Sequence, residues 1–302
     1  MSPAPLRTGV LDVSAAERAA LLVEALPYIQ RFRGLRVVVK YGGNAIGGSD
    51  DLALFAQDIE LMRAVGLRPI VVHGGGPQIS ALMGRLGKEP EFRNGLRVTD
   101  AETVGIARMV LRGQVNPDIV SAINAHGPLA VGVSGEDAGL IRAVPRDPEL
   151  GFVGDVAGID ATLIDRLLAQ ELIPVVATIG ADEAGQAYNI NADTVAAHLA
   201  VAARATKLVY LTDIEGLRAD VADPASLISR TTARELDEMI HSGRLRGGMV
   251  PKIEACVLAV RAGVPNAHIL DGRVPHVLLL ELFTDEGVGT MITDESPEEA
   301  AP

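Results

Sequence analysis

Short apolar runs rich in β-branched residues alternate along this chain with longer stretches in which apolar residues recur at helical spacing. The apolar runs predict six strands, at Leu35–Lys40, Pro69–His73, Leu129–Ser134, Ile173–Thr178, Lys207–Thr212 and Ala267–Asp271. Strands that alternate with helices predict an α/β fold with an open, mainly parallel sheet and helices on both of its faces.

Several helices have recognisable start signals. Asn116-Pro117 reads as an N-cap followed by a proline at the first helical position. Thr99–Glu102 and Thr232–Glu235 both fit the capping-box pattern, in which a hydroxyl residue is followed three positions later by a glutamate. We therefore expect a helix to begin at each of these three places.

An additional helix is predicted before the first strand. Ser14–Glu17 is another capping box, and Leu22, Leu26, Ile29 and Phe32 follow at helical spacing. Pro27 falls inside this helix and should bend it. An apolar stripe outside the sheet needs a surface to cover it, either on its own domain or on a neighbouring subunit.

Composition and charge narrow the classes of partner. The chain has 302 residues, of which 48% are hydrophobic and 3% aromatic, and its net charge is −12. This charge argues against nucleic acid or an anionic membrane as a partner, since either requires a basic face. The single cysteine, Cys256, excludes a disulfide framework and is expected to be a buried apolar residue in a reducing, cytoplasmic environment. No apolar run is long enough to cross a membrane.

Three glycine-rich turns carry the candidate chemistry. They lie at Val39–Ala45, His73–Pro77 and Arg246–Lys252, and the first and third also contain a lysine, Lys40 and Lys252. Consecutive glycines let backbone N–H groups approach an anion closely, and a following helix N-terminus adds partial positive charge. The three turns together favour anion binding over plain tight turns.

The common nucleotide-binding signatures are absent. The sequence contains no G-x-x-x-x-G-K-[ST] motif, no G-x-G-x-x-G after a strand, and no protein-kinase signature set. A P-loop NTPase, a dinucleotide-binding Rossmann domain and a protein kinase are therefore disfavoured.

Six motifs resemble the amino-acid kinase superfamily and, within it, the acetylglutamate kinase family. They are Lys40–Ala45, His73–Pro77, Asn94–Thr99, Asn189–Asp193, Leu211–Leu217 and Gly247–Lys252, in family order over nearly the whole chain. The resemblance implies a three-layer α/β/α sandwich. It also implies an N-terminal extension with an oligomerisation helix over residues 1–33, an acyl amino acid-binding lobe over 34–203, and an ATP-binding lobe with an effector site over 204–302.

The resemblance also implies roles for individual residues. The catalytic positions are Lys40, Lys252 and Asp193, and the substrate-binding positions are Gly75, Gly76, Arg97 and Asn189. The nucleotide-binding positions are Gly42, Gly43, Thr212, Asp213, Gly216, Leu217, Gly247, Gly248 and Met249. ATP is the implied cosubstrate, with Mg²⁺ held mainly by the nucleotide and no metal site in the protein.

Elementary chemistry agrees with a kinase that needs no general base. The γ-carboxylate of an acylated glutamate has a pKa near 4.3 and is already nucleophilic at neutral pH. Catalysis then requires alignment and charge neutralisation, and His73 is expected to pack or hydrogen-bond. Alternatives remain for single residues: Asp193 could merely favour a helix capped by Asn191, and Arg97 could be a surface ion-pair partner. Whether Asp213 and Glu215 contact a metal or are ordinary turn residues is also open.

The predicted activity is ATP-dependent phosphorylation of N-acetyl-L-glutamate in arginine biosynthesis, with L-arginine as inhibitor. The resemblance to the arginine-sensitive branch implies an effector pocket at Lys207, His268, Glu281 and Gly287, and a homohexamer built as a trimer of dimers through the N-terminal helices. Two alternatives are an arginine-sensing regulator with little kinase activity and a kinase of another small carboxylate. A helix folded onto its own subunit is the alternative to the hexamer.

Overall fold

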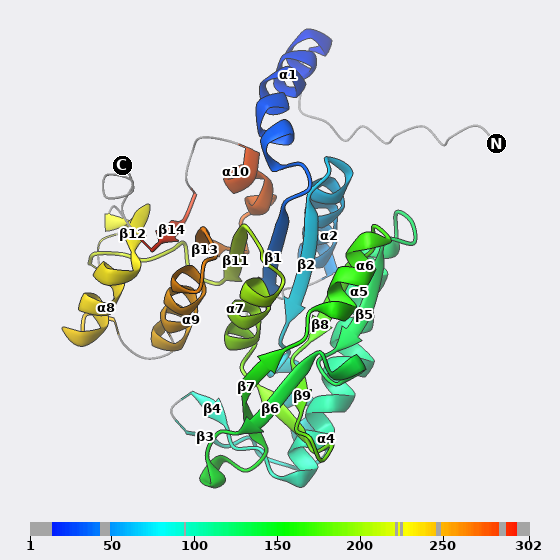
Figure 1. The fold of residues 1–302 in the computed structure, drawn as a ribbon, viewed down its shortest axis with the longest axis vertical. Helices are drawn as coiled ribbons and strands as arrows, with labels where there is room; N and C mark the ends of the chain where they lie inside the picture. The colour runs from blue at the N-terminus through cyan, green and yellow to red at the C-terminus, as the bar shows by residue number, and fades with distance from the viewer. Residues whose placement is uncertain are drawn as a thin grey trace.

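A computed structural model describes residues 14–42, 49–93, 95–220, 223, 226–245, 249–283 and 288–294. Its centre is an eight-stranded sheet with the strand order β12-β14-β13-β11-β1-β2-β8-β5 (Figure 1). The strands are β1 (Arg36–Tyr41), β2 (Arg68–His73), β5 (Ala130–Ser134), β8 (Ile173–Ala177), β11 (Lys207–Thr212), β12 (Arg230–Thr232), β13 (Asn266–Asp271) and β14 (Thr290–Thr293). All neighbours run parallel except β13 and β14. The predicted parallel α/β sheet is confirmed. Its six predicted strands correspond to six neighbours in the sheet order, from β13 at one end of the run to β5 at the other.

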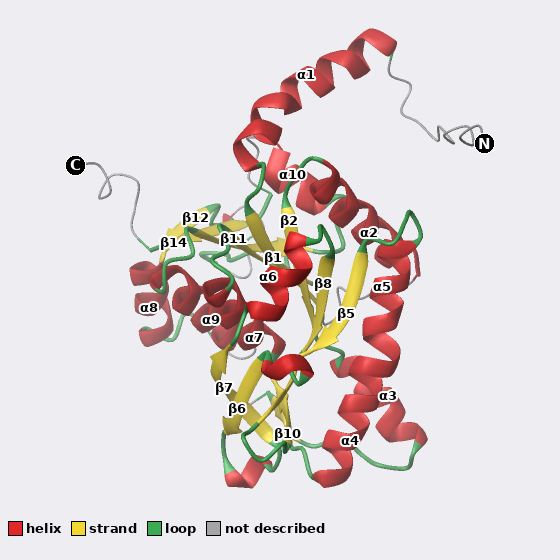
Figure 2. Ribbon diagram, turned by 45° about the vertical axis from the view of Figure 1, so that its right-hand side comes forward, coloured by secondary structure: helices red, strands yellow, loops and turns green. Residues whose placement is uncertain are grey.

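Helices cover both faces of this sheet, as the α/β/α sandwich requires (Figure 2). One face packs on α2 (Ser49–Ala64), α5 (Asn116–Asn124) and α10 (Val277–Phe283). The other packs on α6 (Thr162–Ala169), α7 (Ala192–Ala202), α8 (Ala233–His241) and α9 (Met249–Arg261). Successive residues of a strand point to opposite faces, so Val37 and Val39 enter the first core and Val38 enters the second.

A second, smaller group of strands lies beyond the carboxyl ends of β5 and β8. It consists of β6 (Ile141–Pro145), β7 (Val153–Ile159), β9 (Ile179–Ala181) and β10 (Ala187–Ile190). A short hairpin of β3 (Phe92–Arg93) and β4 (Leu96–Arg97) lies nearby, as do α3 (Gly76–Arg85) and α4 (Ala101–Val110) (Figure 1). These small strands were not predicted from the sequence.

Two of the predicted capping boxes are confirmed. The Ser14 hydroxyl accepts from the Glu17 amide while the Glu17 carboxylate accepts from the Ser14 amide, and Thr232 and Glu235 do the same at α8. The prediction at Thr99 is wrong by one position, because Asp100 caps α4 by accepting from the Thr103 amide.

The predicted N-cap at Asn116 is wrong. The helical chain continues from α4 through a π-helical turn, η2 (Leu111–Val115), directly into α5, and Val115 and Asn116 both have helical backbone angles. No helix start needs capping there, and the Asn116 side chain is instead bound to residues of the sheet.

The N-terminal helix α1 (Ala15–Phe32) extends away from the rest of the subunit (Figure 1). It continues through Pro27, and its apolar residues Leu22 and Leu26 are 72% and 47% exposed. Its C-terminal end is anchored, where Tyr28 packs against the core and the buried ring of Phe32 meets Phe283 of α10 edge-on. Within the described ranges, no helix has both the length and the apolar character needed to cross a membrane.

Candidate functional site

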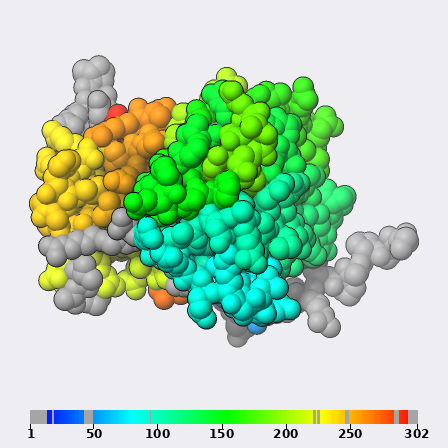
Figure 3. Space-filling model, turned by 90° about the horizontal axis from the view of Figure 1, so that it is seen from below, coloured from blue at the N-terminus to red at the C-terminus, as the bar shows by residue number. Residues whose placement is uncertain are grey.

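The candidate catalytic residues meet at the carboxyl edge of the parallel sheet. Lys40 is near the end of β1, Asp193 is in the first turn of α7, and Lys252 is in the first turn of α9. Loops after parallel strands converge at this edge, which is where ligands bind in open α/β sheets. Seen from below, segments from the first half of the chain lie beside the C-terminal helices α8 and α9 (Figure 3).

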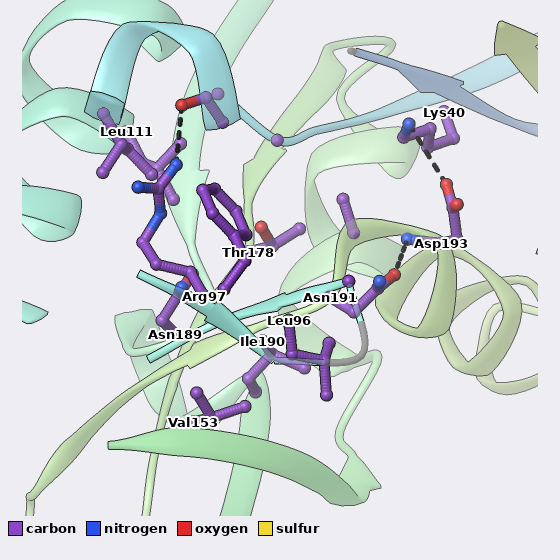
Figure 4. A pocket seen from close by; sticks show the side chains of 17 residues that line it. Lys40, Leu96, Arg97, Leu111, Val153, Thr178, Asn189, Ile190, Asn191 and Asp193 are labelled. Carbon is purple, nitrogen blue, oxygen red and sulfur yellow. Dashed lines mark hydrogen bonds and ion pairs between the residues drawn. The ribbon is translucent and has the colours of Figure 1, made fainter. Parts of the chain in front are cut away.

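Asp193 holds both lysines with its two carboxylate oxygens. Lys252 Nζ donates to Oδ2 at 2.9 Å. Lys40 Nζ lies 3.1 Å from Oδ1, as Figure 4 shows. The Lys40 contact is an ion pair without the alignment of a hydrogen bond, so Oδ1 has no hydrogen-bond donor among the described residues. The three groups are largely buried and together carry one net positive charge.

The electrostatics of this cluster depend on its burial. Burial alone would raise the pKa of Asp193, but the two lysines outweigh it and lower the pKa of the carboxylate. Burial lowers the pKa of the Lys40 ammonium, Asp193 opposes this effect, and Lys252 adds to it. Asp193 therefore keeps two like charges side by side in a site where water is scarce.

Neighbouring groups hold this arrangement in place. The Asn191 side chain caps α7 by accepting from the amides of Asp193 and Thr194. The Tyr210 hydroxyl donates to the Asp193 carbonyl at 2.9 Å, and Lys252 Nζ lies 5.0 Å from the centre of the Tyr210 ring. The helix-capping alternative proposed for this motif thus applies to Asn191, while the Asp193 side chain contacts the lysines.

A cavity of about 220 Å³ opens beside Lys40 and Asp193. It contains all four residues predicted to bind the substrate, which are Gly75, Gly76, Arg97 and Asn189. A polar cavity of this size matches a small acyl amino acid better than a macromolecule.

Arg97 lies across this cavity from Lys40 (Figure 4). Its guanidinium donates to the Gly76 carbonyl at 2.9 Å and to the Ser80 hydroxyl at 2.8 Å, and it lies 4.6 Å from the centre of the Phe92 ring. The residue is 6% exposed, and no carboxylate within the described ranges pairs with it. Burial also lowers the pKa of Arg97. Because the residue is buried and has no such partner, the alternative of a surface ion pair does not describe it.

A second cavity, of about 330 Å³, contains several of the predicted nucleotide-binding residues. Asp213, Gly216, Leu217 and Met249 line it together with three arginines, which are Arg218, Arg244 and Arg273. Thr212 is buried at the end of β11, immediately before this lining. Gly42 lies beside the side chain of Lys40, since a Cβ atom there would be 3.3 Å from Lys40 Nζ. Gly43, Gly247 and Gly248 lie outside the described residues.

The predicted effector residues form a buried cluster near the opposite edge of the sheet. His268 Nδ1 lies 2.8 Å from a Glu281 carboxylate oxygen, and Lys207 Nζ lies 3.3 Å from His268 Nε2. Lys207 is also 5.5 Å from the centre of the Phe32 ring, at the end of α1. Gly287 lies outside the described residues.

Three further residues at this site were not singled out from the sequence, two that line the cavity and one that holds Arg97. Phe92 stacks on Arg97, Ser80 holds it, and Thr178 follows strand β8 at the cavity wall. Thr178 could have been found from its position at the carboxyl end of a predicted strand, whereas Phe92 and Ser80 have no local signal.

Residues 35–271 match the Amino acid kinase family, and the chain belongs to that family. It is 55% identical over 291 residues to an acetylglutamate kinase of Symbiobacterium thermophilum, covering 93% of this chain and 99% of that protein. The chain is therefore a kinase, and its resemblance to the acetylglutamate kinases is confirmed.

Solved structures show the same fold. An N-acetylglutamate synthase from Neisseria gonorrhoeae, complexed with coenzyme A and N-acetyl-glutamate, aligns with a TM-score of 0.80 and 30% identity over 92% of this chain. The same synthase complexed with coenzyme A and L-arginine aligns with a TM-score of 0.77 and 28% identity over 92% of this chain. The matched part of this chain spans 64% and 66% of those longer proteins.

Proposed function

We propose that this kinase transfers the γ-phosphoryl group of ATP to the γ-carboxylate of N-acetyl-L-glutamate, in the cytoplasm and in arginine biosynthesis. A carboxylate oxygen forms the new bond to phosphorus while the bond to the ADP oxygen breaks. The products are N-acetyl-L-glutamyl 5-phosphate and ADP. No proton has to be removed from the nucleophile, since a carboxylate of pKa near 4.3 is ionised at neutral pH.

One observation carries this proposal. The cavity has on one side a buried arginine that pairs with no carboxylate among the described residues, and the Lys40–Asp193–Lys252 cluster on the other. An acylated glutamate has two carboxylates of different roles, one to be held and one to react. Arg97 suits the α-carboxylate, because a guanidinium can bind both of its oxygens.

The proposed mechanism follows from the charges that surround the second carboxylate. Lys40 and Lys252 would neutralise the negative charge that spreads over the phosphoryl oxygens, and Asp193 would orient them. Asn189 would hold the N-acetyl end, and the backbone of Gly75 and Gly76 would contact the reacting groups. Mg²⁺ carried by the nucleotide would supply further charge neutralisation. We assign the second cavity to the nucleotide; its lining includes Arg244 beside the Arg218–Glu215 and Arg273–Asp271 ion pairs, with Gly42, Gly43, Thr212, Gly247 and Gly248 proposed to border it.

This assignment divides the chain into two functional lobes. We propose that residues 34–203 bind the acyl amino acid and residues 204–302 bind ATP. The main sheet continues across this division through the pairing of β1 with β11. The reacting groups would then meet over the ends of these two neighbouring strands.

A substrate panel tests the proposed reaction. Acyl phosphate is trapped with hydroxylamine after incubation with Mg-ATP and N-acetyl-L-glutamate, L-glutamate, L-aspartate or carbamate. We expect N-acetyl-L-glutamate to react best, with L-glutamate far poorer because it lacks the acetyl group. Preferred turnover of any other acceptor would favour the alternative of a kinase for another small carboxylate.

We further propose feedback inhibition by L-arginine in a homohexamer built as a trimer of dimers. The exposed residues Leu22 and Leu26 on α1 support contact with another subunit. The Lys207–His268–Glu281 cluster adjoins the end of α1, and the Glu281 carboxylate could bind a guanidinium. The synthase structure complexed with L-arginine, which has the same fold, also supports an effector of this kind.

Sedimentation tests the proposed assembly. The full chain should sediment as a hexamer, and a chain without residues 1–31 should sediment as dimers that keep catalysis but lose much of the inhibition. A full-length dimer that ignores millimolar arginine would contradict the proposal. The alternative of an arginine-sensing regulator predicts arginine binding with little turnover in the substrate panel.

A further inference from the structure

The residue before the glycine turn of the substrate cavity, His73, is held at both ring nitrogens. Its side chain is completely buried at the end of β2. Nδ1 lies 2.9 Å from the Gly74 carbonyl oxygen, and Nε2 lies 2.9 Å from the side-chain nitrogen of Asn116. A kinase acting on an ionised carboxylate has no use for a base here, so this arrangement needs another explanation.

The hydrogen-bond partners of Asn116 and His73 determine which nitrogen of the His73 ring carries the proton. The Asn116 nitrogen is also 2.9 Å from the Val175 carbonyl oxygen, and a carbonyl can only accept. The amide nitrogen of Asn116 therefore faces both groups and donates one hydrogen to each. His73 Nε2 must then be the unprotonated acceptor, and Nδ1 carries the hydrogen and donates it to the Gly74 carbonyl. Burial lowers the pKa of His73 to about 4, so the ring stays neutral at physiological pH.

The helix that carries Asn116 also contacts the next residue of the glycine turn. Leu111 and Val115 belong to the π-helical turn η2, and a Cβ atom at Gly75 would lie 2.7 Å and 3.1 Å from their side chains. On the sheet, a Cβ atom at Gly132 would lie only 1.9 Å from the Asn116 side-chain oxygen. The Asn116 amide thus occupies space that only a glycine at position 132 leaves open.

The bond from His73 also fixes the direction of the Gly75 amide. A trans peptide is planar, and its C=O and N–H groups point in opposite directions. Because the Gly74 carbonyl points toward the imidazole, the Gly75 N–H points away from it. Gly75 is buried and lines the substrate cavity, and its N–H makes no hydrogen bond to another described residue.

We propose that His73 and Asn116 are positioning residues for the phosphoryl transfer. Asn116 holds His73 in the Nδ1–H form, and His73 in that form orients the Gly74–Gly75 peptide so that its amide can donate to an anion in the cavity. The identity of that anion rests on the proposed function. The protonation state of His73 and the orientation of the peptide do not.

Two substitutions of similar shape at His73 test the role of the donor. In His73→Asn the side-chain nitrogen occupies the position of Nδ1 and can still donate to the Gly74 carbonyl, whereas His73→Leu cannot donate. We expect His73→Leu to lower kcat/KM for N-acetyl-L-glutamate at least about tenfold, and His73→Asn to stay within about threefold of the original chain. The KM for ATP should change little in both, and both should keep a cooperative thermal transition. Equal activity of the two folded variants would overturn the proposal.

A measurement without substrate separates this inference from the proposed function. Magic-angle-spinning NMR of protein labelled with ¹⁵N-histidine distinguishes the Nδ1–H from the Nε2–H tautomer, and His73→Asn identifies the His73 signals by their loss. We expect Nδ1–H in the original chain and loss of this preference in Asn116→Leu, which has the shape of asparagine without its donors. Nε2–H in the original chain, or an unchanged spectrum in Asn116→Leu, would overturn the inference even if the enzyme phosphorylates N-acetyl-L-glutamate. The expected spectra in a protein that turns over no N-acetyl-L-glutamate would instead refute the proposed substrate and support the assigned tautomer.

Discussion

Replacing Asp193 by asparagine tests the central electrostatic argument of the site. The substitution keeps the shape of the side chain but removes the carboxylate charge between Lys40 and Lys252, which lie 3.1 and 2.9 Å from its oxygens. At an effective dielectric constant of about 20, one such contact is worth about 5 kcal/mol before desolvation is counted. Removing one partner of a buried ion pair typically costs about 3–5 kcal/mol.

The protein can avoid part of this cost by releasing a proton from one lysine. Without Asp193, the weaker effect of Asp213 is left to oppose burial and Lys252, which both lower the pKa of Lys40. The Lys40 ammonium should therefore lose its proton at a lower pH than in the original chain. Since the ammonium is the form proposed to neutralise the phosphoryl group, the alkaline decline of kcat should move to lower pH.

The assay is hydroxylamine trapping over a range of pH at saturating Mg-ATP and N-acetyl-L-glutamate. We expect Asp193→Asn to lower kcat at least about 100-fold at neutral pH, equivalent to about 2.7 kcal/mol of barrier. Asp237→Asn is the matched control, because it breaks a surface ion pair with Arg261 that is remote from the site. A kcat within about threefold of the original, with an unmoved alkaline decline, would refute the reasoning.

Three further predictions follow from the contacts described. Lys252→Ala should lower kcat more than it raises the KM for N-acetyl-L-glutamate. Arg97→Ala should mainly raise that KM, by about 10- to 100-fold. The same pattern in both variants would show that one of the two roles is misassigned. Between pH 6.5, the ordinary pKa of histidine, and about 4, the pKa of buried His73, this histidine is protonated in the unfolded chain but neutral in the folded protein. The free energy of unfolding should therefore fall as the pH drops through this range, by about 3 kcal/mol in total. Thermal melts from pH 7 to 4.5 should therefore show a weaker pH dependence in His73→Asn, and parallel slopes would contradict this. Glu281→Ala should blunt inhibition by arginine in the trapping assay without changing the sedimentation of the assembly, and undiminished inhibition would remove Glu281 from the effector site.

The sequence predicted the centre of the fold better than its periphery. The six predicted strands of the main sheet are five or six residues long with mostly buried apolar residues, and their predicted ends lie within a residue of the observed ones. At one end of the main sheet, β12 and β14 have only three and four residues, and β9 of the smaller group has three, so no periodic pattern can identify them. Their pairing depends on partners that are distant in the sequence.

The candidate site shows a similar division. Motif resemblance identified Lys40, Asp193 and Lys252, which the fold brings together from three distant segments. The contacts that support a site residue were not predictable, as for the stacking of Phe92 on Arg97. At Asn116 the sequence was misleading, because an asparagine before a proline is a common helix start even where the residue is inside a continuous helix.

The π-helical turn before Asn116 absorbs one extra residue without changing the direction in which the following helix faces. An α-helix advances about 100° per residue, and a π-turn accommodates one residue more than an α-turn in about the same rotation. Deleting a single residue from Leu111–Val115 would therefore leave a regular helix in which the Asn116 side chain still faces His73. Removing a second residue would shorten a helix that is already regular, so it would rotate the following segment by about 100° about the axis and carry Asn116 away from His73. The segment thus tolerates the loss of one residue but not of two.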